Sequence, residues 1–551
     1  MPDKSFDAVI VGGGNKALIL AMYLTKYGNM EVGIFEDRHE LGGGWSQEEP
    51  APGFIGYPCS MAHTSFYHTP VYWDFPEWEL YGARYATTKT TQGAMFLEDE
   101  TCVLQYAAFP EVDPNQELTA ASIGRFSQRD AEMYLWLWNK CQKYWRYAFL
   151  EHFFNPAKPV EEPDGIDKLF KNPESGIDPR WLFMSAEQLF QDIFEDPHNQ
   201  AAFLRAAQSM GLPVGEVGSG FSSLYMIFFY MPYINYAVGG SHVLAHASQR
   251  VILENGGKVF TNVPVENVII KNGKAIGVKL ENGSEIEAKK CVITSLDPYQ
   301  TCIKLIGKEN LGPDISRKIK NLQVDGCPLM WYSWAFSEIP KYKAEAWNPD
   351  VRECMWSGLA DLDPTAFRTE WAERRINKWP SKMNVGVAYH GPTDICPEDS
   401  LLAPPEKNYV FVTEQYTLPT WCLSEKEWIE KQDRYAEDII ELWQKYAPNV
   451  TFDNLIGYLA VTPYYSTNMC RNWGRSGNIV VIDNCASQWG RFRPITELAG
   501  HKVPNISDLY VTGSGWHPWG SAHSAQGYNC YKVIAEDFGL RKPWEEEDRP
   551  F

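Results

Sequence analysis

Cysteine motifs are missing from this sequence, although cysteine itself is not. Twelve cysteines are scattered along the chain, with no Cys-x-x-Cys pair and no metal-ligand spacing. His63 and His68 lie close together, but neither a cysteine nor a carboxylate stands at ligand spacing beside them. We therefore expect no metal site, no disulfide chemistry, and reduced, mostly buried thiols in a reducing compartment.

Positive charge is also scarce. The chain carries 50 Lys and Arg residues against 70 Asp and Glu residues, which gives a formal net charge of −20. A chain of this charge repels polynucleotides, and no Lys/Arg-rich run would hold it on an anionic membrane. We expect no nucleic-acid partner.

Long apolar runs are absent as well. No window approaches ~20 uncharged apolar residues, the length that spans a bilayer, so we expect no transmembrane helix. The chain opens MPDKSFD and runs directly into a strand, without the features of a signal peptide. These patterns predict a cytoplasmic protein and leave a peripheral membrane contact open.

A glycine-rich turn near the N-terminus organises the remaining features. The apolar run at residues 8–11 predicts a buried parallel strand, and residues 17–24 predict a helix. Between them the spacing is Gly12-x-Gly14-x-x-Ala17. Gly12 allows the tight turn, Gly14 lets a pyrophosphate approach the backbone, and Ala17 lets helix and strand pack closely.

The charge on this motif supports the same interpretation. The N-terminus of the helix offers unpaired N–H groups and a positive dipole end to phosphates. Glu36 follows a second short strand at residues 32–35, where its carboxylate can accept hydrogen bonds from ribose hydroxyls. The motif therefore predicts a dinucleotide-binding site rather than an ordinary glycine-rich turn.

Two further segments fit a ligand of this kind. The segment EDRHELGGGW, residues 36–45, is similar to the second glycine pair of flavoproteins with two dinucleotide-binding domains, although a flexible surface loop is the alternative. Near the C-terminus, a strand at residues 509–512 meets the turn Gly513-Ser514-Gly515, and a helix follows at residues 524–537. A second helix N-terminus can therefore face the ligand.

The middle of the chain gives less specific signals. Strands are expected at residues 258–260, 265–270, 275–280, 285–288 and 291–295, and a helix at residues 424–446 begins with a Ser424/Glu427 capping box. No second glycine motif follows a strand there, which argues against an NAD(P)H domain of the disulfide-reductase kind.

Two aromatic segments have open assignments. A helix that starts after Ser127 is expected to turn one face inward, with Met133, Trp136, Leu137, Cys141, Tyr144 and Ala148 on it. The stretch FSSLYMIFFYMPYINY, residues 221–236, carries no charge. It could line a hydrophobic substrate tunnel, touch a bilayer surface, or form core.

The motifs together resemble the phytoene desaturase-like (carotenoid desaturase/isomerase) FAD oxidoreductases, and most closely the pyridine nucleotide-disulfide oxidoreductase domain-containing protein 2 branch. The matching pieces are VIVGGGNKALILAMYL, FEDRHELGGGW, EEPAPGF, FSQRDAEMY, SGNIVVIDN and LYVTGSGWHPWGSAHSAQG, with the meander NGGKVFTNVPVENV to CVITSLDP between them. They span residues 6–538, nearly the whole chain.

The resemblance implies a fold class and a division of the chain. The fold is α/β, a Rossmann-type FAD domain of the two-dinucleotide-binding-domain kind with a discontinuous α+β substrate domain. The FAD domain would comprise residues 1–85, 237–300 and 476–551. The substrate or cap domain would comprise residues 86–236 and 301–475.

The resemblance also assigns roles to residues. The residues implied to bind FAD are Gly12, Gly14, Ala17, Glu36, Arg38, Gly42, Gly43, Gly44, Trp45, Val265, Gly513, Gly515, His517 and Pro518. Where the family has a glycine run after His-Pro, this chain has Trp519-Gly520-Ser521-Ala522-His523. His517, His523 and His63 are the candidate catalytic residues. His517 or His523 would be the proton acceptor, and His63 would lie near the flavin; ordinary packing is the alternative for each.

The implied activity is FAD-dependent dehydrogenation or desaturation of an apolar isoprenoid, terpene or other hydrocarbon-like substrate. Redox-neutral double-bond isomerisation is one alternative, and a non-catalytic, FAD-stabilised subunit of a hetero-oligomer is another. The electron acceptor is open between a quinone and a redox protein, and the oligomeric state between homo- and hetero-oligomer. The bulk of Trp45 and Trp519 argues against long linear polyenes.

Overall fold

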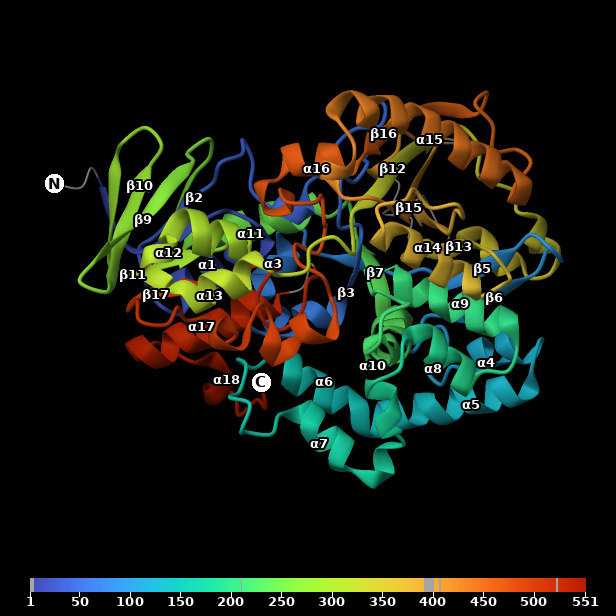
Figure 1. Ribbon diagram of the computed structural model, residues 1–551, viewed down its shortest axis with the longest axis horizontal. Helices are drawn as coiled ribbons and strands as arrows, with labels where there is room; N and C mark the ends of the chain where they lie inside the picture. Colours follow the sequence, from blue (N-terminus) through green and yellow to red (C-terminus); the bar gives the residue numbers. More distant parts are fainter. Residues whose placement is uncertain (1–3, 210, 391–400, 406–407, 522–523) are drawn as a thin grey trace.

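The computed structural model describes residues 4–209, 211–390, 401–405, 408–521 and 524–551. Two large sheets and a layer of helices make up most of it (Figure 1). The first sheet and its helices lie on one side of the molecule, and the second sheet lies on the other side above the helical layer (Figure 1).

The first sheet contains the strand that precedes the glycine turn. Its strand order is β8-β2-β1-β11-β10-β9, with β17 paired to the end of β11. The strands are β1 (Lys4–Val11), β2 (Val32–Phe35), β8 (Lys258–Phe260), β9 (Val265–Lys271), β10 (Lys274–Leu280), β11 (Glu285–Thr294) and β17 (Leu509–Val511). β8, β2, β1, β11 and β17 run parallel, and β9 and β10 add an antiparallel meander.

Helices cover both faces of this sheet. Ala8 and Ile10 of β1 pack toward α1 (Asn15–Lys26), which also contacts α11 (His242–Glu254) and α17 (Ala525–Phe538). Phe6 and Val9 face the opposite way, toward the segment that holds α12 (Lys308–Leu311) and α13 (Pro313–Lys320). Because both faces are buried there, residues 8–11 of β1 are continuously apolar, as the sequence predicts for a parallel strand.

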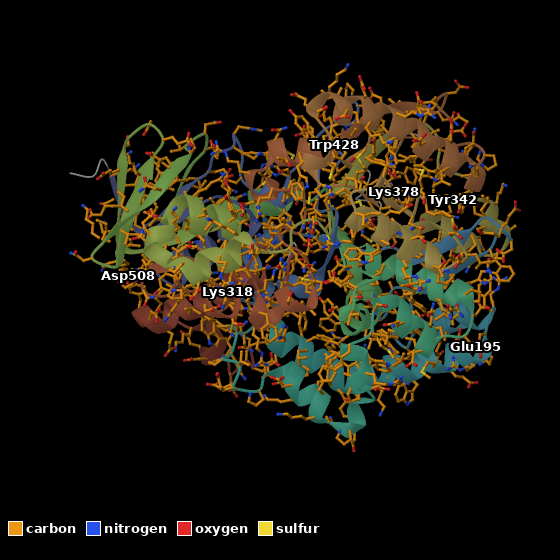
Figure 2. The ribbon with its side chains drawn as sticks, viewed as in Figure 1. Glu195, Lys318, Tyr342, Lys378, Trp428 and Asp508 are labelled. Carbon is orange, nitrogen blue, oxygen red and sulfur yellow. The ribbon has the colours of Figure 1, made fainter. Side chains whose placement is uncertain are left out.

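The second sheet is seven-stranded and mostly antiparallel, in the order β16-β12-β15-β14-β13-β5-β6. Its strands are β5 (Thr90–Phe96), β6 (Cys102–Tyr106), β12 (Leu329–Phe336), β13 (Trp356–Ala360), β14 (Val385–His390), β15 (Tyr409–Tyr416) and β16 (Leu455–Val461). One face is covered by α15 (Glu425–Tyr446), which buries Trp428 against it (Figure 2). The Ser424/Glu427 capping box is present, as expected.

The remaining elements connect these layers. A three-stranded sheet has the order β3-β7-β4, formed by β3 (Ala62–Thr64), β4 (Tyr85–Ala86) and β7 (Ile234–Ala237). The other helices are α2 (Thr69–Asp74), α3 (Pro76–Leu80), α4 (Glu117–Gly124), α5 (Gln128–Lys140), α6 (Arg146–Phe153), α7 (Gly165–Lys171), α8 (Ala186–Ile193), α9 (Pro197–Gln208), α10 (Ser219–Tyr225), α14 (Thr365–Arg375), α16 (Pro463–Met469) and α18 (Pro543–Glu546).

Two expectations about elements need correction. The strands expected at residues 285–288 and 291–295 form one continuous strand, β11. The expected inward face of the helix after Ser127 is partly wrong: Trp136 is 43% exposed, while Tyr134 and Trp145 are buried. Tyr134, Leu137, Trp138 and Cys141 are buried at regular helical spacing, so the inward face of the helix lies beside the expected one.

Two further features are absent among the described residues. No helix in that part of the chain is long and apolar enough to cross a membrane. No group of three or more His, Cys, Asp and Glu side chains there is arranged to hold a metal ion.

Candidate functional site

A cavity lies at the carboxyl ends of β1 and β2, beside the glycine turn. It has a volume of about 220 Å³. Parallel sheets place ligand sites at this edge, where helix N-termini and strand ends converge. Six of the residues expected to bind the cofactor line it: Gly12, Gly14, Glu36, Arg38, Gly43 and Val265.

Glu36 is held firmly at the wall of this cavity. Its Oε2 accepts a hydrogen bond from the backbone N–H of Gly13 (2.6 Å), and its Oε1 accepts one from the N–H of Arg38 (2.8 Å). Burial raises the pKa of Glu36, and these two hydrogen bonds oppose that effect. The carboxylate is thus placed to accept hydrogen bonds from a polar ligand.

The second glycine loop is attached directly to the first. Gly42 donates from its N–H to the carbonyl of Gly13 (2.9 Å), and Asn15 donates to the carbonyl of Gly42 (3.1 Å). Gly42 has φ +112°, a backbone conformation that favours glycine. The loop is therefore not a flexible surface loop; Gly42 and Ala17 do not line the cavities but support the turn that does.

A second cavity, of about 120 Å³, adjoins the first. Four residues line both: Gly14, Gly43, Cys470 and Asn472. A Cβ added to Gly14 would meet nothing within 4 Å, whereas one on Gly43 would approach the Cα of Gly14 to 3.1 Å. On the side of Gly14 and Gly43, the junction between the two cavities is lined by backbone without side chains. A long ligand can therefore extend from one cavity into the other.

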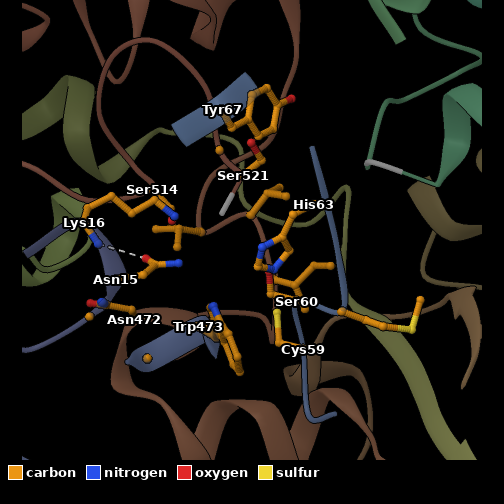
Figure 3. A pocket seen from close by; sticks show the side chains of 18 of the residues that line it. Asn15, Lys16, Cys59, Ser60, His63, Tyr67, Asn472, Trp473, Ser514 and Ser521 are labelled. Carbon is orange, nitrogen blue, oxygen red and sulfur yellow. Dashed lines mark hydrogen bonds between the residues drawn. The ribbon is translucent and has the colours of Figure 1, made fainter. Parts of the chain in front are cut away.

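The second cavity contains further predicted residues and one that sequence reasoning missed. Gly44, Gly513 and His63 line it, as does Lys16 from the first turn of α1 (Figure 3). Lys16 is 3% exposed, and its ammonium has no hydrogen-bond or ion-pair partner among the described residues. Burial lowers the pKa of Lys16 to about 7, and the nearby charge of Arg493 also lowers it.

His63 lies at the cavity wall in its neutral form. Burial lowers the pKa of His63 to about 3, and the positive charge of Lys16 adds to that effect. Its Nδ1 is 2.9 Å from the hydroxyl of Tyr85, and the ring of Trp45 stacks on it at 6.2 Å between centroids. Trp45 is fully buried and supports His63 from behind without lining the cavity.

His517 is placed elsewhere. Its Nε2 donates a hydrogen bond to the carbonyl of Asn155 (3.0 Å), and its ring packs against those of His152 and His501. Burial lowers its pKa to about 3. Neither His517 nor Pro518 nor Gly515 lines either cavity; Gly520 and Ser521 of the same segment do. His523 lies outside the described residues.

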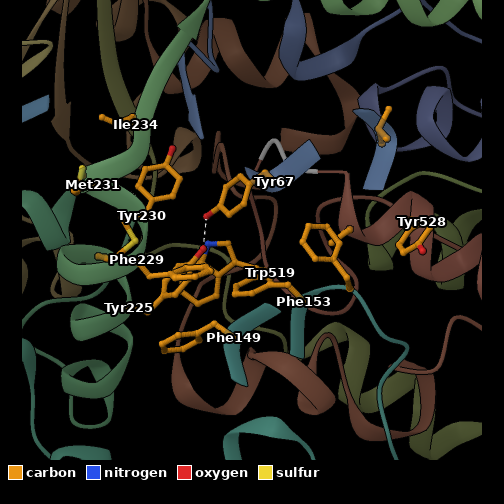
Figure 4. Close-up of a cluster of buried hydrophobic side chains, with 14 of the residues drawn as sticks. Tyr67, Phe149, Phe153, Tyr225, Phe229, Tyr230, Met231, Ile234, Trp519 and Tyr528 are labelled. Carbon is orange, nitrogen blue, oxygen red and sulfur yellow. Dashed lines mark hydrogen bonds between the residues drawn. The ribbon is translucent and has the colours of Figure 1, made fainter. Parts of the chain in front are cut away.

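One wall of the second cavity is aromatic and apolar. Tyr67, Tyr230, Met231 and Ile234 line it. Behind them lies a buried cluster that includes Phe149, Phe153, Tyr225, Phe229 and Trp519 (Figure 4). The hydroxyls of Tyr67 and Tyr225 are 2.5 Å apart. The uncharged stretch at residues 221–236 is thus buried, where part of it lines the cavity and the rest forms core.

The opposite wall comes from the seven-stranded sheet. Side chains alternate along β12, so that Met330 and Tyr332 face α15 while Trp331 faces the cavity. Glu414 of β15 is directly opposite Trp331 in the register and faces the cavity too. Trp356 of β13 completes this wall.

Lys16 and Glu414 were missed because each is a single charged residue in an apolar run. The signals were present: a lysine inside GGGNKALIL, and a glutamate inside the strand YVFVTEQY. Whether such a side chain reaches a cavity depends on how strands and helices distant in sequence pack together, and a local sequence pattern does not contain that information.

Comparison with known proteins gives a consistent set of similarities. No family model matches the chain. A protein of Castellaniella defragrans named as a subunit of limonene dehydrogenase is 24% identical, over 99% of this chain and 97% of that protein. Pyridine nucleotide-disulfide oxidoreductase domain-containing protein 2 of Rattus norvegicus is 23% identical, over 97% and 94%. Prolycopene isomerase of Daucus carota is 24% identical over 56% of this chain and 45% of its own length.

Solved structures show the same architecture. Putrescine oxidase bound to putrescine superimposes with a TM-score of 0.58 at 12% identity, over 97% of this chain and 99% of that one. An oxidoreductase from Methanosarcina mazei gives 0.56 at 15% identity, over 96% and 99%. The α/β fold class and the family resemblance inferred from the motifs are thereby confirmed.

Proposed function

We propose that this protein is an FAD-dependent oxidoreductase that removes hydride from an apolar, terpene-like substrate. One observation carries the proposal: a glycine-lined cavity at the strand ends continues into a second, mostly apolar cavity with aromatic side chains on two of its walls. The names of the similar dehydrogenase, isomerase and desaturase proteins support it.

The residues present fit an FAD. Glu36 and the backbone of Gly12 would hold the ribose, and the backbone of Gly14 and Gly43 would bound the pyrophosphate. Lys16, a buried ammonium without a partner among the described residues, would meet the negative charge of the cofactor. We propose residues 1–85, 237–300 and 476–551 as the FAD domain. Every strand of the first sheet comes from one of these segments: β1 and β2 from the first, β8 to β11 from the second, and β17 from the third.

When bound, FAD supplies the acceptor for a hydride from an otherwise unactivated C–H bond. The chain would exclude water with its aromatic wall and orient the carbon skeleton between that wall and the indoles of Trp331 and Trp356. Of the candidate catalytic histidines, His63 is the one that lines the cavity among the described residues. Its lowered pKa makes it a weak base, and we propose a positioning role for it.

Two alternative functions have specific support. The similarity to prolycopene isomerase favours a redox-neutral isomerase, which would form product without a stoichiometric electron acceptor. The similarity to a protein named as a subunit favours a hetero-oligomer, in which this chain could bind FAD without turning over substrate. A quinone or a redox protein as electron acceptor also stays a proposal.

Anaerobic reduction tests the proposed function. The FAD-loaded protein is mixed without oxygen with cyclic and acyclic terpenes, and the flavin absorption is followed. We expect bleaching with at least one of them. No bleaching, together with isomerised product, would favour the isomerase; no bleaching and no product would leave only the non-catalytic subunit.

A further inference from the structure

The wall formed by the seven-stranded sheet carries a buried carboxylate that the proposed function does not use. Glu414 is 2% exposed and lines the second cavity. Its Oε1 pairs with Arg205, which is 1% exposed. The side chains of Ser209 and Trp356 lie close enough to the carboxylate to lower its pKa by hydrogen bonding, but Oε2 makes no hydrogen bond of normal geometry among the described residues. Buried polar atoms are nearly always hydrogen-bonded, so an unpaired oxygen at a cavity wall points to a ligand.

A donor lies beside this acceptor. Trp331 is the cross-strand neighbour of Glu414 in the β12–β15 register and lines the same cavity. Its Nε1 is buried and likewise has no hydrogen-bond partner in the part of the chain that the structure describes. Side chains directly opposite each other in an antiparallel pair are close enough to contact one small group.

The charge balance indicates which chemical group of a ligand would bind between Glu414 and Trp331. Arg205 compensates the charge of Glu414, so the site has no uncompensated negative charge that would require a cation. Burial raises the pKa of Glu414 to about 7, against the lowering effects of Arg205, Ser209 and Trp356. A hydroxyl both donates and accepts, and it therefore matches one free carboxylate oxygen next to one free indole N–H.

We propose that Glu414 and Trp331 bind a hydroxyl group of the substrate, so that the substrate class is a terpene-like alcohol rather than a plain hydrocarbon. This inference rests on the proposed function, because the apolar part of the same molecule would contact Tyr230 and Met231. Glu414 accepts the hydrogen bond from the hydroxyl, and the indole of Trp331 donates one to its oxygen.

Calorimetric binding to the FAD-loaded protein tests this without turnover. The ligands are a cyclic monoterpene, the primary alcohol with the same skeleton, and the corresponding primary amine. We expect the alcohol to bind about tenfold or more tightly than the hydrocarbon, the difference made by a hydrogen bond to a charged group. Glu414→Gln and Trp331→Phe should each reduce that preference, taken as the ratio of alcohol affinity to hydrocarbon affinity measured on the same variant.

Glu370→Gln is the matched control. Glu370 is also fully buried, accepts hydrogen bonds from Gln208 and Asn384, and does not line the cavity. It should keep the preference for the alcohol. Retained FAD binding shows that each variant is folded, and Trp331→Phe decides if Glu414→Gln does not fold.

Three results would overturn the inference: equal binding of alcohol and hydrocarbon, an unchanged preference in both variants, or tightest binding of the amine. The proposed function fails separately, when no terpene or terpene alcohol bleaches the flavin even though the alcohol binds.

Discussion

Lys16 offers the sharpest test of how the cavities bind their cofactor. Its ammonium is buried without a partner among the described residues, and its pKa is lowered to about 7, with Cys59, Arg493, His63 and His68 as its charged or titratable neighbours. A hydrogen bond to a charged group contributes about 1.5–3 kcal/mol. We therefore expect Lys16→Met to weaken FAD binding about 10-fold to 150-fold near pH 6, where Lys16 is protonated.

The same interaction should fade at alkaline pH. Because the pKa of Lys16 is lowered to about 7, its amine is mostly neutral in the free protein above that pH. Lys16 must then bind a proton when FAD binds. That uptake costs about 1.4 kcal/mol per pH unit, or about 2.7 kcal/mol at pH 9. The wild-type affinity should fall toward that of Lys16→Met as the pH rises.

Titration of the apoprotein with FAD across this pH range, followed by calorimetry, measures both effects. Lys26→Met is the control on the same helix, because Lys26 pairs with Glu77 and lines neither cavity. Parallel pH profiles for the wild type and Lys16→Met would refute the assignment of Lys16 to the cofactor.

Three further predictions follow from the same geometry. Gly14→Val should fold normally, because Gly14 has φ −67° and an open Cβ position. It should nevertheless lose FAD, because the new side chain closes the junction between the two cavities. Gly500→Val, also with open space, should retain FAD when the flavin absorption of both purified variants is measured. His517→Gln should lower the melting temperature but change the rate of flavin bleaching less than about twofold, since His517 lines neither cavity; a larger fall in rate would restore it as a proton acceptor. Arg549→Ala should cost about 3 kcal/mol in urea unfolding, because it leaves the buried Asp74 without its ion pair (2.5 Å); a cost near zero would show that Tyr23, which also donates to Asp74, suffices.

The cofactor side of the site could be predicted because its signals are local. The turn at Gly12 and Gly14, the acid at Glu36 and the second loop at Gly43 follow from backbone requirements within a short segment, and all of these residues line one cavity. A strand, a turn and a helix in sequence suffice to place them.

The substrate side could not be predicted in the same way. Glu414 lies opposite Trp331 only because β15 pairs with β12 in one register, and a shift of β15 by one residue would turn Glu414 away from the cavity. His517 is carried away from the cavity by its contact with Asn155, which lies far from it in sequence. The buried face after Ser127 was misplaced because this helix carries aromatic side chains on more than one face, and tertiary packing buries Tyr134 rather than Trp136.

The most direct test of the central claim is the identity and amount of the cofactor released when the purified protein is denatured, measured by mass spectrometry and absorption. We predict FAD at about one molecule per chain, or stoichiometric uptake of added FAD by a colourless preparation. A protein that releases no flavin and shows no calorimetric binding of FAD would contradict this claim.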